Sequence, residues 1–89
     1  MMRLKQDTSL GENLYRLRKM HGYSQERLTA QMQLYGCAIS REIYSQMERG
    51  VHGLPISDLL VLSEIYNCPV EEFFLNLPIP QKCADFYPG

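Results

Sequence analysis

Apolar side chains recur along this chain at spacings of three and four residues. Leu10, Leu14 and Leu17 make one such stripe, and Leu28 with Met32 makes a second. A third stripe lies further along the chain and consists of Leu59, Leu62, Ile65 and Tyr66. An α-helix completes a turn every 3.6 residues, so this spacing places the apolar residues on one face of a helix. The sequence shows no period-two alternation, which would be typical of strands.

Serine residues mark the expected helix starts. Three times an apolar residue precedes a Ser, and another apolar residue follows four positions after it. The three sets are Tyr23-Ser24 with Leu28, Ile39-Ser40 with Tyr44, and Ile56-Ser57 with Val61. This spacing is typical of an N-cap Ser, whose hydroxyl accepts a free backbone N–H, flanked by a hydrophobic staple. Ser9 and Glu12 have the spacing of a capping box and predict a fourth start.

Residues that tolerate a left-handed backbone mark the expected helix ends. Gly22, Gly36, Gly50 and Asn67 each follow a helical stretch, where such a residue commonly ends a helix. Pro69 suits the first turn of a last, short helix. The pattern therefore predicts helices over 10–21, 25–35, 41–49, 58–66 and 70–75. Because the connections are short, we expect the fold to be an all-α, compact five-helix bundle.

Length and composition indicate a single globular domain. The chain has 89 residues, of which 45% are hydrophobic and 21% charged. We expect an N-terminal arm over 1–9, a helical domain over 10–75 and an extended tail over 76–89, where three Pro residues exclude a helix. Phe73 and Phe74 are expected to close the end of the bundle. Three interpretations of the tail are open: an arm across a dimer partner, a strap over the same subunit, or a disordered end.

The sequence gives no sign of a metal, a disulfide or a membrane segment. Cys37, Cys68 and Cys83 are odd in number and widely spaced, which argues against a disulfide framework and a zinc site. No apolar run approaches the roughly 18 residues that span a bilayer. The N-terminus also lacks the apolar stretch of a secretory signal. We therefore expect a cytoplasmic protein without a metal or other cofactor and without a membrane partner.

Catalysis is not expected. His21 and His52 have no Ser, Cys or acid at a spacing that would assemble a triad. The stretch "GVHGLP" lacks the Lys and the Ser or Thr of a phosphate-binding loop. The chain is therefore predicted not to be an enzyme.

Charge is unevenly distributed along the chain, whose formal net charge is −1. Residues 1–49 hold eight Lys and Arg against five Asp and Glu, a net charge of +3. Residues 50–89 hold one Lys against five acids, a net charge of −4. The distribution of charge, more than its total, decides which face meets a polyanion. A nearly neutral chain can therefore still present a basic side to nucleic acid.

Two neighbouring predicted helices carry a specific signature. The stretch "GYSQERL" opens the helix over 25–35, and "ISREIYSQMERG" forms the helix over 41–49. With "LRKMHG" before them and "LLVLSEIYNCPVEEFF" after them, they resemble the lambda-repressor-like (Cro/XRE) helix-turn-helix family over about residues 10 to 75. The resemblance implies a DNA-binding domain of a transcriptional regulator that acts as a dimer. The connection "QMQLYGCA" departs from the phage repressors, since it is several residues longer than their tight turn.

The resemblance also implies an ion pair between Arg18 and Glu48. Such a pair would tie the helix over 41–49 to the rest of the domain and would remove Glu48 from the side that faces DNA. The competing interpretation is two unrelated, solvated side chains.

The outward row of the helix over 41–49 supplies the candidate base readers. In a helix-turn-helix protein the second helix of the motif lies in the major groove, with its N-terminal residues nearest the bases. With Ser40 as the cap, the residues that would face the groove are Arg41, Glu42, Ser45 and Gln46. Arg41 can donate twice to guanine, Gln46 can pair with adenine, and Glu42 can accept from cytosine. Glu42 also repels phosphate, so it would lower affinity while it raises selectivity.

Contacts to the DNA backbone are expected at the start of the helix over 25–35. A helix start presents free N–H groups, which bind phosphate readily, and Ser24 and Gln25 lie there. The resemblance implies that Gln25 binds the backbone. Arg49, Tyr35 and His52 are further candidates, and for each of them a solvated surface role is an equal alternative.

The expected partner is double-stranded DNA with a pseudo-palindromic operator, bound by a homodimer that acts as a repressor. One copy carries few cations and would bind weakly, whereas a two-fold dimer doubles the contacts. Leu75 and Leu77 are the expected dimer surface. The alternative is a protein-interaction module, such as an antitoxin that binds a partner protein. The acidic second half of the chain and Glu42 favour that alternative.

Overall fold

The computed structural model describes residues 2–77, with side chains described from residue 10 onward. Four α-helices and a 3-10 helix follow in chain order: α1 (Met2–Met20), α2 (Gln25–Leu34), α3 (Arg41–Glu48), α4 (Ile56–Tyr66) and η1 (Val70–Phe74). The predicted all-α class is confirmed, although the fifth element is a 3-10 helix instead of an α-helix. The predicted tail lies outside the described residues, apart from residues 76 and 77.

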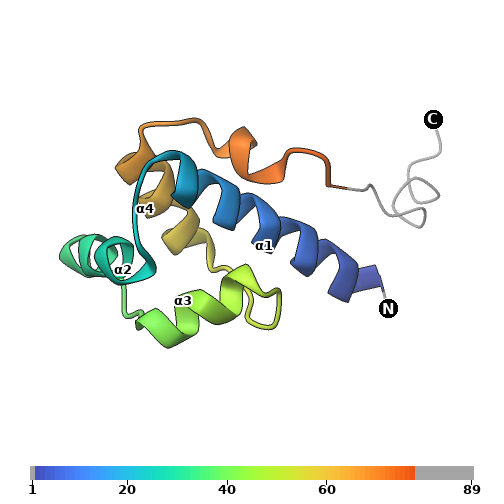
Figure 1. Cartoon of the computed structure of the whole chain (residues 1–89), viewed down its shortest axis with the longest axis horizontal. Helices are drawn as coiled ribbons and strands as arrows, with labels where there is room; N and C mark the ends of the chain where they lie inside the picture. Colours follow the sequence, from blue (N-terminus) through green and yellow to red (C-terminus); the bar gives the residue numbers. More distant parts are fainter. Residues whose placement is uncertain (1, 78–89) are drawn as a thin grey trace.

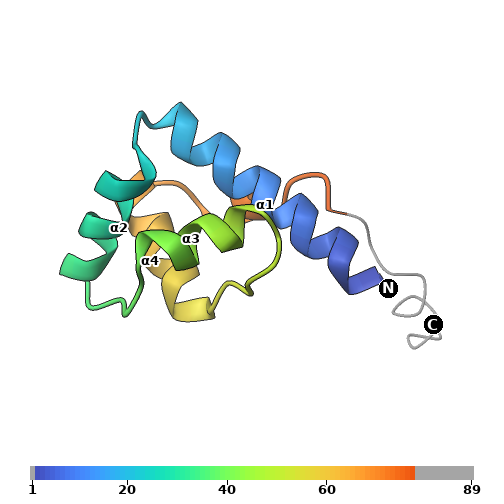
Figure 2. The same cartoon turned by 60° about the horizontal axis from the view of Figure 1, so that its bottom comes forward.

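α1 is the central element of the fold. It packs against α3 on one side and against η1 on the other (Figure 1). α2 packs against both α3 and α4. Turning the molecule brings α3 to the front, where no other described element covers its outer side (Figure 2). None of the helices within residues 2–77 is both long and apolar enough to cross a membrane.

The core is formed by the inward faces of the helices. Its buried apolar members are Leu14, Leu17, Leu28, Met32, Ile39, Tyr44, Met47, Leu62, Tyr66 and Phe73. The expectation that Phe73 and Phe74 both close the bundle is wrong for Phe74, whose side chain is 44% exposed. A 3-10 helix has three residues per turn, so neighbouring side chains diverge widely and only Phe73 reaches the core.

Most helix boundaries follow the predicted signals. The hydroxyl of Ser24 accepts the N–H of Arg27 at 3.1 Å, and that of Ser40 accepts the N–H of Ile43 at 3.2 Å. The predicted stop residues all have a positive φ, between 52° and 96°; they are Gly22, Gly36, Gly50 and Asn67. These boundaries are determined locally, which is why the sequence predicts them well.

Two predicted helix starts are wrong. α1 begins at Met2, so Ser9 lies inside the helix and the predicted N-terminal arm is helical from its second residue. Most residues before Ser9 are good helix formers, so the helix continues past the capping box. α4 begins at Ile56 with Pro55, not Ser57, as its N-cap. Its first turn instead contains the buried carboxylate of Asp58, which the helix dipole favours there.

Two close contacts hold α1 to its neighbours. A Cβ atom at Gly11 would lie 2.8 Å from the carbonyl oxygen of Met47 and closer still to that of Glu48. The backbone of α1 therefore touches the end of α3. On the other side, the buried amide of Asn13 donates to the carbonyls of Phe73 at 3.0 Å and Leu75 at 2.9 Å. α1 thus fixes both α3 and the chain that leaves η1.

Candidate nucleic-acid interface

α3 has one buried face and one open face. Tyr44 and Met47 on the inner face are 0% and 2% exposed. The outer face forms a shallow hollow along the helix, lined by Arg41, Glu42, Ser45, Gln46 and Arg49. The structure therefore brings the four candidate base readers together with Arg49 on one surface.

A second hollow lies where α2 begins. It is lined by the end of α1, the following turn and the starts of α2 and α3: Arg18, Lys19, Gly22, Tyr23, Ser24, Gln25, Glu26 and Arg41. The first N–H groups of a helix have no carbonyl partner within it and carry a positive partial charge, so they suit an anion. The Oγ atom of Ser24 already accepts the N–H of Arg27, which leaves its own hydroxyl hydrogen for the hollow.

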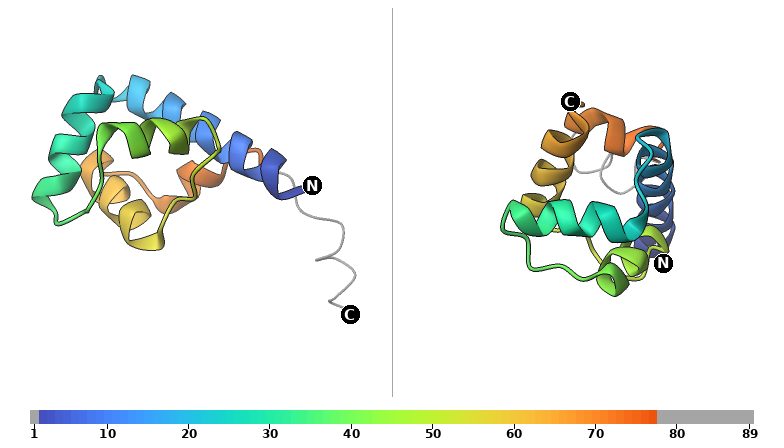
Figure 3. Two further views of the ribbon diagram at one scale, coloured as in Figure 1. Left: turned by 90° about the horizontal axis from the view of Figure 1, so that it is seen from below. Right: turned by 60° about the vertical axis from the view of Figure 1, so that its left-hand side comes forward.

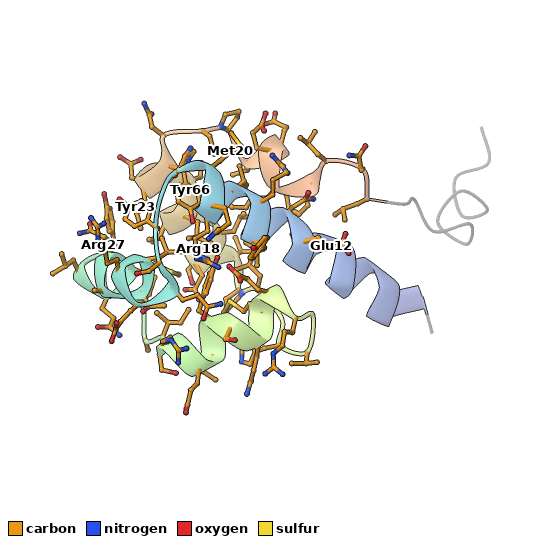
Figure 4. All side chains as sticks on the ribbon, viewed as in Figure 1. Glu12, Arg18, Met20, Tyr23, Arg27 and Tyr66 are labelled. Carbon is orange, nitrogen blue, oxygen red and sulfur yellow. The ribbon has the colours of Figure 1, made fainter. Side chains whose placement is uncertain are left out.

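Arg18, which lines the hollow at the start of α2, is paired with Glu48 at the end of α3. Arg18 Nε donates to Glu48 Oε2 at 2.7 Å, and the two side chains are 8% and 7% exposed. Arg18 also donates to the carbonyl of Tyr23 at 2.9 Å. Figure 4 shows Arg18 between α1, α2 and α3. The hydrogen bond to Glu48 raises the pKa of Arg18 above its ordinary value and outweighs the opposing effect of burial. The two side chains are therefore paired and shielded from solvent.

Gln25 joins this pair. Its Nε2 atom donates to Glu48 Oε1 at 3.0 Å. The amide has two N–H groups, so one holds Glu48 and the other remains for the hollow. The family resemblance implies only a DNA-backbone contact for Gln25, and the sequence did not predict this link between the start of α2 and the end of α3. Because Glu48 accepts from both Arg18 and Gln25, its charge is satisfied within the protein.

The fold agrees with a comparison against known families. A family model described as Helix-turn-helix, of the Cro/XRE type, matches residues 14–73. The chain belongs to this family. The Cro/XRE family consists of non-catalytic DNA-binding domains, so membership implies DNA binding and a role in transcriptional regulation. No curated protein and no solved structure matches the chain.

In this Cro/XRE domain the long connection between α2 and α3 is held in place. Gln33 Nε2 donates to the carbonyl of Ile39 at 2.7 Å, and the Ile39 side chain is buried in the core. Figure 3 shows this connection passing from α2 to the start of α3.

The same connection contains Cys37. Burial and the neighbouring Asp58 raise the pKa of the Cys37 thiol to about 11. The thiolate, which is the reactive form, is therefore disfavoured at neutral pH.

Two candidate backbone contacts lie away from the hollows. Tyr35 is the C-cap of α2 and is 52% exposed, at the opposite end of that helix from Gln25. His52 is exposed between α3 and α4, with its Nδ1 atom 2.7 Å from the carbonyl oxygen of Gly53.

In contrast, Lys19 lines the hollow at the start of α2 but was not among the residues predicted from the sequence to contact DNA. Its position in the last turn of α1, shortly before Gly22, could have indicated that it lies near the start of α2. Among the side chains of residues 10–77, no group of three or more His, Cys, Asp or Glu could hold a metal ion.

Proposed function

We propose that this Cro/XRE domain is a sequence-specific repressor that inserts α3 into the major groove of DNA. The observation that carries the proposal is the open outer face of α3, where five polar side chains share one surface while the inner face is buried. An α-helix fits the major groove. Gln46 suits adenine, Glu42 suits the amino group of cytosine, and Ser45 suits either a donor or an acceptor. A domain that occupies an operator excludes other proteins from it.

Contacts to the DNA backbone would fix the depth of α3. The hollow at the start of α2 supports one such contact, because it combines free N–H groups with the second N–H of Gln25 and with cations. Arg49, at the far end of the outer face, supports another.

We also propose that two copies bind together as a homodimer. Phe74 and Leu75 are large apolar residues that are 44% and 42% exposed. They lie at the end of η1, on the side of α1 opposite to α3, so an interface there leaves α3 free for DNA (Figure 1). Asn13 holds the backbone that presents them. Two-fold symmetry would double the contacts to an operator with inverted half-sites.

Selection of bound duplexes from a random pool tests the function. We expect an enriched sequence with two inverted half-sites about one helical turn apart, roughly 10 bp. Affinity for it is expected to fall steeply as salt increases, because phosphate contacts release counterions. Failure to enrich any sequence would contradict the proposal. It would favour the antitoxin-like alternative, in which the same surface binds a protein.

A further inference from the structure

Arg41 differs from the rest of the outer face of α3 because it lines both hollows. Of these two hollows, Glu42, Ser45, Gln46 and Arg49 line the one along α3 and not the one at the start of α2. Arg41 is the first residue of α3 and is exposed. Side chains on a helix lean toward its N-terminus, so a side chain at the first position leans beyond the end of the helix. That direction leads to the start of α2.

Lys19 borders the same hollow from a different helix. It lies in the last turn of α1 and is exposed. Its Nζ atom lies 6.0 Å from the centre of the Tyr15 ring. Within residues 10–77, the one ion pair joins Arg18 to Glu48, and neither Lys19 nor Arg41 is paired with an acid there. Two free cations, from α1 and α3, thus flank the free N–H groups of α2, and the hollow has a single unpaired acid in its lining, Glu26.

We propose that Lys19 and Arg41 hold one backbone phosphate between them at the start of α2. Arg41 then anchors the DNA and does not read a base. The inference rests on the proposed binding of α3 in the major groove and assigns a role within it. Base reading starts at Glu42 and continues with Ser45 and Gln46. A phosphate held in this way contacts α1, α2 and α3 together, so it sets the depth at which α3 enters the groove.

Equilibrium binding of the full chain to two duplexes tests this assignment. One duplex is the sequence selected from the random pool, and the other has an unrelated sequence; both are titrated over a range of salt. Arg41→Ala is expected to weaken binding to both duplexes by the same factor, on the order of three- to tenfold. The slope of log affinity against log salt is expected to fall by about 1 for each bound copy of the chain. Lys19→Ala should reproduce this pattern.

Arg41→Lys separates the two roles most sharply. Phosphate accepts a point charge, whereas the two-donor contact with guanine needs a guanidinium. An anchor therefore tolerates Lys, and we expect Arg41→Lys to recover most of the affinity for both duplexes.

Two further variants serve as controls. Gln46→Ala should weaken binding to the selected duplex alone and leave the salt slope unchanged. Arg16→Ala removes a cation on the η1 side of α1, where Arg16 donates to the carbonyl of Glu72 at 3.2 Å. It reports the effect of losing one distant charge, and we expect an unchanged salt slope.

Two outcomes overturn the inference in distinguishable ways. A loss confined to the selected duplex, without recovery in Arg41→Lys, would make Arg41 a base reader and leave major-groove binding intact. If the wild-type chain bound neither duplex, or if its binding did not depend on salt, the proposed function itself would be contradicted, and the inference with it.

Discussion

A basic and an acidic side chain lie at each end of α3, but they are buried at one end and exposed to solvent at the other. At the C-terminal end, the side chain of Glu48 is 7% exposed and accepts hydrogen bonds from Arg18 and Gln25. At the N-terminal end, Arg41 and Glu42 are exposed, and neither forms an ion pair with a side chain of residues 10–77. The buried charge determines where the helix lies, and the exposed charges are available to a ligand. Within a helix of eight residues, one end thus holds the helix in place and the other end is available to recognise a ligand.

Desolvation explains the difference. Burial of an ion costs several kcal/mol unless well-placed partners compensate, so Glu48 depends on both of its donors. Exposed charges keep their water, and a pair between them would contribute little to stability. Substitutions at the buried end should therefore change the free energy of unfolding, and substitutions at the exposed end should change the affinity for DNA.

The largest effect is expected for Glu48→Ala. It leaves the buried Arg18 without its counter-charge, which should cost about 3–5 kcal/mol of stability in urea unfolding. The melting temperature should fall by more than about 10 °C. A double variant, Arg18→Met with Glu48→Leu, should lose much less because no charge is left unpaired. A loss below about 1 kcal/mol in the single variant would mean that the pair does not position α3.

Gln46→Ala should have a comparable effect on recognition with almost none on folding. Removal of its bidentate hydrogen bonds to adenine should cost about 1–3 kcal/mol at one base position. Competition between duplexes that differ at single positions measures this cost. Stability should stay within about 0.5 kcal/mol of wild type. Equal weakening at every position would contradict the assignment of Gln46 as a base reader.

Gln25→Ala should affect both properties, because this residue lies between the two regions. Loss of its hydrogen bond to Glu48 should cost about 1–2 kcal/mol of stability. Its affinity for all duplexes should fall by a common factor. Gln31→Ala, at an exposed position of the same helix, is the matched control and should change neither property. Loss of discrimination at one base would instead place Gln25 among the base readers.

Glu42→Gln should have the smallest effect, and it should be a gain. Removal of a negative charge that faces phosphates should raise the affinity for unrelated DNA by about 0.5 kcal/mol at low salt. The preference for cytosine at the facing position should weaken. Glu64→Gln on α4 makes the same change of charge at an exposed position of another helix and serves as the control. Equal gains in both variants would show that only net charge matters.

The sequence predicted what depends on neighbouring residues. The caps Ser24 and Ser40 and the left-handed stops at Gly22 and Gly36 act over a few residues, so their spacing is sufficient. The family signature located α2 and α3 for the same reason. The start of α1 was mispredicted because good helix formers precede the capping box and compete with it.

The remaining features depend on how the helices pack. Gln25 and Glu48 are 23 residues apart in the chain, and nothing in either local pattern indicates their hydrogen bond. The Arg18–Glu48 pair, 30 residues apart, was expected only through the family resemblance. Periodicity placed Arg41 on the outer face of α3 but could not place the start of α2 beside it.

Gly11 has a consequence that reaches well beyond its own position. Only the hydrogen atom of a glycine fits at this position, because the last carbonyl groups of α3 lie against the backbone of α1. A methyl group would push that end of α3 outward, and a short stiff helix pushed at one end tilts as a whole. The angle at which the protein meets a duplex is therefore set partly by a residue that never touches it.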